Sequence, residues 1–154
     1  MLQKVATTGV DLGSVYTRTL QRMEEQKGDR SRLGMEVLMW ISHAKRPLTP
    51  SELRYAMAVE AGSMDLDKGD ICPQDIIVRS CLGLVVVDEG SSIVRLIHYT
   101  LQKYFRLPNI LPAPHQTLAL TCLTYLNYDQ VKRPPADKIP TLCDIPFLGY
   151  SSLY

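Results

Sequence analysis

Two short runs of β-branched residues interrupt a sequence whose other apolar residues follow helical spacing. The runs, 84–87 and 93–97, flank the segment 88–92, which reads Asp-Glu-Gly-Ser-Ser and has the composition of a hairpin turn. The sequence therefore predicts one β-hairpin set among helices.

Apolar spacing predicts helices on both sides of this hairpin. Thr49-Pro50-Ser51-Glu52 is the clearest local signal, because a Thr cap, a Pro at the first helical position and a Glu three residues after the cap can satisfy free backbone amides. The expected helices are 11–27, 33–44, 50–59, 73–84 and 99–106. Successive helices, a hairpin and a further helix are the order of a winged helix-turn-helix, and no internal repeat indicates a solenoid.

The remaining chain predicts further helical structure. Pro108, Pro112 and Pro114 indicate a linker, a helix follows from Leu118, and prolines at 134, 135 and 140 indicate a second break. We therefore expect a mainly α fold with a small hairpin wing, flanked by helical segments. Its parts would be a helical connector at 1–29, a winged-helix domain at 30–107 and the start of a following helical segment, cut short, at 108–154.

Composition excludes several classes of function. With 17 basic and 16 acidic residues, the chain has no global field that would attract nucleic acid or anionic lipid. No signal segment or membrane-spanning run is present in the sequence. The four cysteines lack metal-ligand spacing, so we expect buried thiols, no metal site and a reducing, cytoplasmic setting. Trp40 is expected in the core.

No catalytic motif is complete. The sequence contains neither a P-loop nor a Gly-x-Gly-x-x-Gly turn after a strand. Segment 149–153 begins like a nucleophile elbow but lacks the second glycine and a preceding strand. We expect no catalytic residue and no enzyme activity in this chain.

DNA recognition by a winged helix normally uses a basic helix and a basic wing. Here the candidate recognition helix, 73–84, has Arg79 against Asp75, and the wing tip is Asp88-Glu89. An acidic wing would repel phosphates, which argues against nucleic acid as a partner.

The three histidines are too scattered in the sequence to predict a cluster. His43 ends a helix, where a cation would favour the helix dipole, and His115 falls in the proline-rich linker. His98 lies where the second strand gives way to a helix, so its imidazole could donate to an anion. The structural alternative is a partly buried, helix-capping histidine.

Several ordered segments resemble fungal NACHT proteins, which are STAND-class signalling NTPases related to NOD-like receptors. The matching segments are 12–20, 37–41, 46–53 and 95–100. Residues 30–107 are also similar to the winged helix associated with GPI inositol-deacylase, although the lipase serine motif is absent from this sequence. Segments 122–126 and 146–154 resemble the helical region that leads toward ankyrin or WD40 repeats.

The resemblance implies a specific role for His98. In related STAND proteins a histidine at the end of the wing contacts the β-phosphate of ADP and holds the closed state. The aspartate that follows this histidine in plant proteins is Tyr99 here, which departs from that motif. The implied cofactor, ADP or ATP, belongs to an NTPase core outside this chain, and none is expected on the chain itself.

The resemblance therefore implies a non-catalytic regulatory module in signalling such as fungal self/non-self recognition. Its implied partners are the NTPase core and downstream repeats of the same polypeptide, with oligomers of the parent protein. The alternatives are a stand-alone winged-helix binder of DNA or protein, and a truncated gene product without a present function.

Overall fold

The structure, a computed structural model, describes residues 6–133, 141 and 144–154. The described elements follow the predicted order, with a hairpin between helices. Their bounds are α1 Ala6–Glu24, α2 Arg30–His43, α3 Pro50–Met57, the 3-10 turn η1 Lys68–Asp70, α4 Gln74–Ser80, β1 Val85–Asp88, β2 Ile93–Leu96, α5 Tyr99–Phe105, α6 Pro114–Asn127, α7 Asp129–Lys132 and α8 Leu148–Ser151. The mainly helical fold with one small hairpin is confirmed.

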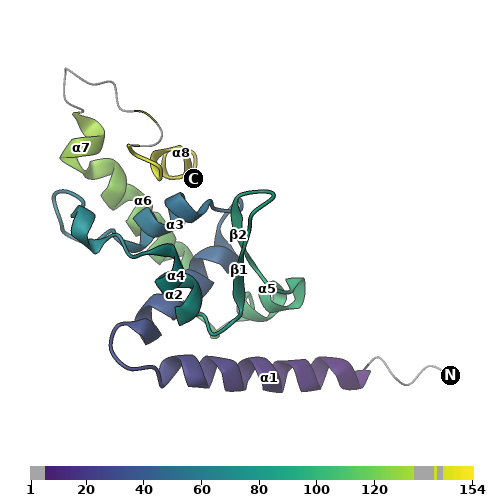
Figure 1. Ribbon diagram of the computed structural model, residues 1–154. Helices are drawn as coiled ribbons and strands as arrows, with labels where there is room; N and C mark the ends of the chain where they lie inside the picture. The colour runs from purple at the N-terminus through teal and green to yellow at the C-terminus, as the bar shows by residue number, and fades with distance from the viewer. Residues whose placement is uncertain (1–5, 134–140, 142–143) are drawn as a thin grey trace.

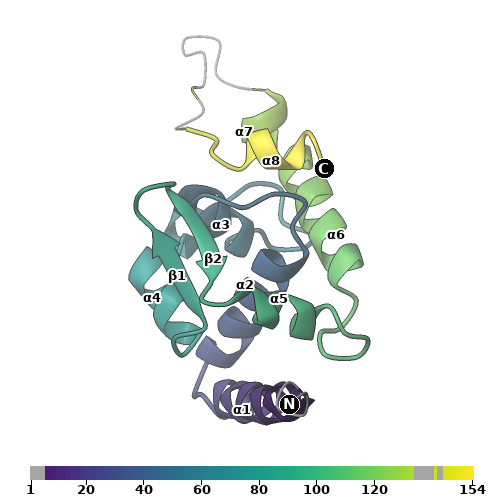
Figure 2. The same ribbon diagram turned by 90° about the vertical axis from the view of Figure 1, so that its right-hand side faces the viewer.

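Helix α2 lies at the centre of the fold (Figures 1 and 2). It contacts α1, α3, α4, α5, α6 and β2, and its Val37, Leu38 and Trp40 are almost fully buried. The hairpin and α6 lie on different sides of α2 (Figure 2). The central helix therefore fixes the positions of both the wing and the C-terminal helices.

The hairpin is an antiparallel pair whose register places Val85 opposite Leu96 and Asp88 opposite Ile93. Val85 and Leu96 are buried, so one face of the wing packs on the helices. The amide of Val94 also donates to the carbonyl of Leu48 (N···O 2.8 Å), which ties the wing to the segment before α3.

The capping box at the start of α3 is present as predicted. The Glu52 amide donates to Thr49 Oγ1 (3.2 Å), and the Thr49 amide donates to Glu52 Oε2 (2.9 Å). Arg46 donates to both Glu52 oxygens, at 2.6 and 3.0 Å, so this buried carboxylate is both capped and paired. Although burial opposes ionisation, the bonds from Arg46 and Thr49 lower the pKa of Glu52.

Glu52→Gln should destabilise the fold by about 1–2 kcal/mol at pH 7, because two charge-assisted bonds weaken. A carboxyl whose pKa is lowered by folding contributes its full stabilisation above its unfolded pKa, which is about 4.3. That contribution is lost as the pH falls from there through the lower pKa of the folded state. The difference between variant and parent in urea unfolding should therefore shrink below pH 4. Glu25→Gln, at an exposed site, is the control. A difference that is the same at pH 3 and pH 7 would contradict this account.

Several predicted helix bounds are wrong. Helix α1 begins at Ala6 rather than 11, α2 at Arg30 rather than 33, and α6 at Pro114 rather than 118. Two of the wrong helix ends have a local cause. Helix α4 begins after Pro73 and ends at Ser80 rather than 84, because Leu82 and Gly83 take positive φ and turn the chain into β1. Helix α1 ends at Glu24 rather than 27, before Gly28 with φ +65°. The predicted break at prolines 134, 135 and 140 lies outside the described residues, as does Cys143.

Helices α6 and α8 pack on α2 through an aromatic cluster. Phe147 lies 5.5 Å from Trp40, 5.1 Å from Tyr125 and 5.7 Å from Tyr150 between ring centroids. Trp40, as predicted, and Phe147 are at most 1% exposed. The segments after the linker therefore share one core with the helices before it.

Candidate functional site

His98 occupies the N-cap position of α5, in the short connection between β2 and this helix. Its backbone is extended and its side chain is exposed. The imidazole makes no capping hydrogen bond, so the capping alternative is wrong. Tyr99 follows with a ring centroid 6.2 Å away. Within the described part of the chain, His98 is thus an exposed imidazole without a hydrogen-bond partner.

A groove with a volume of about 400 Å³ runs past His98 between the wing, α5 and the segment after α2. We call it the His98 groove, and its polar lining side chains are Lys45, Arg46, Arg95, His98, Tyr99, Gln102 and Arg106. No carboxylate is among the described residues that line it. The groove is therefore suited to an anion.

The cations of this groove differ in how far they are already neutralised. Arg46 is committed to Glu52, and Arg95 lies 3.4 Å from Asp88 across the wing. Arg106 uses only its Nε, which donates to the Ser42 carbonyl at 2.9 Å. The terminal nitrogens of Arg106 and the ammonium of Lys45 are the cations left for a ligand, since no ion pair of either exists in the described part of the chain.

Two of the three histidines come together, contrary to the sequence expectation. The rings of His43 and His115 lie 5.5 Å apart in an edge-to-face arrangement. His115 is not in a linker but in the first turn of α6, which begins at Pro114. Burial lowers the pKa of His43, and the charges of His115 and Arg106 lower it further, whereas a hydrogen bond to the Met39 backbone acts in the opposite direction. The net pKa is lowered, so this residue is less readily a cation than expected. His98 lies outside this pair.

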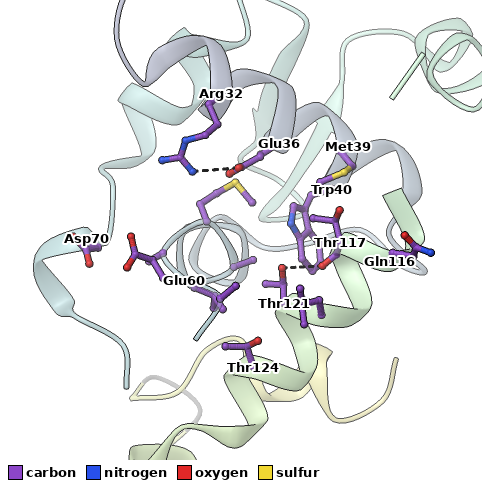
Figure 3. Close-up of a pocket in the computed structure, with 16 residues that line it drawn as sticks. Arg32, Glu36, Met39, Trp40, Glu60, Asp70, Gln116, Thr117, Thr121 and Thr124 are labelled. Carbon is purple, nitrogen blue, oxygen red and sulfur yellow. Dashed lines mark hydrogen bonds and ion pairs between the residues drawn. The ribbon is translucent and has the colours of Figure 1, made fainter. Parts of the chain in front are cut away.

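A larger pocket, of about 800 Å³, opens between α2, the end of α3 and α6. Figure 3 shows Arg32 and Glu36 of α2 facing each other across its upper wall, and Thr117, Thr121 and Thr124 along α6. Arg32 and Glu36 form an ion pair at 3.3 Å, and burial raises the pKa of Glu36. Arg32 is the basic residue among those that line this pocket, and it is already paired. The pocket therefore offers no unpaired cation, unlike the His98 groove.

The surface that would face DNA in a winged helix carries little positive charge. Helix α4 exposes Asp75 beside Arg79. At the wing tip, hydrogen bonds from the Ser91 and Gly90 amides and the charge of Arg95 lower the pKa of Asp88, which is therefore an anion. This surface has the acidic character expected from the sequence.

The described cysteines are poor nucleophiles. Burial raises the pKa of Cys81 to about 12 and that of Cys122 to about 11, so both are thiols at neutral pH. No three His, Cys, Asp or Glu side chains of the described residues are grouped as metal ligands. None of the helices described has the length and apolar character needed to cross a membrane.

A family model described as GPI inositol-deacylase, winged helix domain, matches residues 20–110. The chain belongs to this winged-helix family. The match covers the end of α1, helices α2 to α5 and the wing, and it includes every residue that lines the His98 groove. It ends before α6. No curated protein and no solved structure matches the chain. The sequence given contains no complete lipase serine motif.

Proposed function

We propose that this winged helix is a non-catalytic regulatory module that packs on the nucleotide-binding core of a STAND-type NTPase. In this role the His98 groove faces the core and helps to hold its ADP-bound resting state. The observation that carries the proposal is the exposed, unpartnered His98 in a groove lined by basic side chains without a carboxylate.

The geometry supports a phosphate ligand better than an uncharged one. An imidazole with no internal partner can donate to a phosphate oxygen, and the free nitrogens of Arg106 and Lys45 border the same groove. His98 is held on the rigid junction between β2 and α5, where the Ile97 amide donates to the Leu84 carbonyl at 3.0 Å. The imidazole therefore needs little reordering to meet a ligand presented by another domain.

The proposed regulation depends on a contact between His98 and the diphosphate that exists only in the docked state. His98 would touch the diphosphate only when the winged helix is docked on the core, so ADP would favour the docked state. Exchange to ATP would remove this differential contact and release the module. A contact present in one state only is sufficient to shift a two-state equilibrium.

His98→Ala in the full-length protein should weaken ADP binding about tenfold or more, because a bond to a charged group contributes about 1.5–3 kcal/mol. Basal signalling or self-assembly should rise as the closed state loses this contact. A direct ADP titration measures the effect, and Arg79→Gln on α4 removes a positive charge outside the groove as the control. Unchanged ADP affinity in His98→Ala would refute the proposed role.

The competing proposal, a stand-alone binder of DNA, makes an opposite set of predictions. It requires duplex binding that weakens steeply with salt and depends on Arg79 rather than His98. The upstream reading frame separates the two directly, since a P-loop there supports the regulatory module.

A further inference from the structure

A second basic cavity lies beside the His98 groove, at the junction of α2, α5 and α6. It has a volume of about 440 Å³ and is lined by His43, Ala44, Lys45, Arg106 and His115. We call it the histidine pocket. It shares Lys45 and Arg106 with the His98 groove, but His98 does not line it.

The Ser42 hydroxyl forms a hydrogen bond with Nδ1 of the His43 ring. The buried Ser42 hydroxyl lies 2.6 Å from the Leu38 carbonyl oxygen, 3.3 Å from that of Met39 and 2.8 Å from Nδ1 of His43, and it has one proton to donate. When the hydroxyl donates to Leu38, its oxygen accepts from Nδ1–H of the neutral ring, and protonation of the ring then adds a donor at Nε2.

The charges around His43 are of one sign. The ionisable side chains that face it from the adjoining elements are Lys45, Arg106, His115, Cys122, Tyr150 and Tyr154. No carboxylate belongs to this set, and the positive charges of His115 and Arg106 add to burial in lowering the pKa of His43. Basic groups that repel one another would be stabilised together by a bound anion.

We propose that the histidine pocket is a binding site for a divalent oxyanion such as a phosphate group, and that its affinity rises when His43 takes up a proton. The anion would accept from the free guanidinium nitrogens of Arg106, from the ammonium of Lys45 and from His115 and Nε2–H of His43. The site shares Lys45 and Arg106 with the His98 groove but does not include His98, so replacing His98 separates it from the proposed ADP contact.

The pocket also joins separate parts of the fold. His43 ends α2, Arg106 follows α5, and His115 lies in the first turn of α6. A single anion held by these three side chains would tie α6 to the winged helix beyond the residues that the family model matches.

The test is a titration of the chain with sulfate at constant ionic strength, followed by the ring signals of the three histidines in NMR. Sulfate stays a dianion through the range in which histidine titrates, so any pH dependence reports the protein. We expect saturable shifts of His43 and His115, with binding about three- to tenfold tighter at pH 5.5 than at pH 7.5. Bound sulfate should raise the pKa of His43 by reciprocal linkage.

Two variants and one control test the site. Arg106→Gln and His115→Gln should each weaken sulfate binding at least about fivefold, which is the loss expected of one charged donor. Because His115 is exposed, its replacement should not disturb the core. Arg79→Gln, which removes a distant positive charge, should bind sulfate like the parent. Pyrophosphate in place of sulfate tests whether a phosphate group binds more tightly at the same site.

Shifts of His43 that stay linear with sulfate, or that persist unchanged in both pocket variants, would identify general screening and overturn the proposal. Loss of ADP binding in His98→Ala with normal sulfate binding here would support both sites. Unchanged ADP binding in His98→Ala, with sulfate binding as in the parent, would reject the ADP contact and leave this site standing. Loss of sulfate binding in His98→Ala would place the anion in the His98 groove and overturn the proposal.

Discussion

Gly34→Ala should destabilise the protein by about 2 kcal/mol, although alanine is the better helix former. A Cβ at Gly34 would lie 2.6 Å from the carbonyl oxygen of Ser80 and 2.7 Å from Cε of Met23. The methionine end can move, but the Ser80 carbonyl is backbone and already accepts from Gln26 Nε2 at 2.8 Å. The added methyl group must therefore separate α2 from the end of α4.

Gly13→Ala is the matched control, because Gly13 also lies inside a helix but has nothing within 4 Å of the added Cβ. This variant should be unchanged or up to about 1 kcal/mol more stable. Urea unfolding followed by circular dichroism measures both changes. Equal stabilisation by the two alanines would mean that α2 and α4 do not approach each other as closely as described.

Phe147→Ala should cost about 3–5 kcal/mol, the range for removing a fully buried aromatic ring. Phe147 is 0% exposed and contacts the rings of Trp40, Tyr125 and Tyr150. Because this residue lies beyond the part that the family model matches, the loss would show that α8 belongs to the same cooperative unit as the winged helix. Circular dichroism, together with the fluorescence of Trp40, follows the transition.

Leu153→Ala tests the same segment at a side chain that is 72% exposed and should change stability by less than about 0.5 kcal/mol. A small effect of Phe147→Ala, or an unfolding transition that separates into two steps, would contradict a shared core.

Local chemistry explains which parts of the fold were predictable. The capping box at Thr49 and the hairpin at 88–92 depend on neighbouring residues, and both are present as predicted. The predicted end of α4 was wrong because apolar residues keep helical spacing as far as Leu84. In the structure, positive φ angles at Leu82 and Gly83 end the helix and lead the chain into β1. The tight approach at Gly34 has no local signal, since it depends on Ser80, far along the chain.

In the candidate site, too, features set by neighbouring residues were predictable and features that join distant segments were not. The position of His98 between strand and helix was predicted and is confirmed, whereas its contact with an anion stays a prediction. The basic lining was missed because Lys45, Arg95 and Arg106 come from three separate segments. The pairing of His43 with His115 was missed for the same reason, and because Pro114 was assigned to a linker rather than to the first position of α6.

The central claim is that this winged helix works through the His98 groove and not through α4. Hydrogen exchange of the full-length protein, compared between its ADP and ATP forms, tests it most directly. The account predicts slower exchange in the ADP form for the amides of 44–46 and 95–102, with α4 unchanged, and loss of this difference in His98→Ala. Equal exchange of these segments in both nucleotide forms, or protection confined to α4, would contradict it.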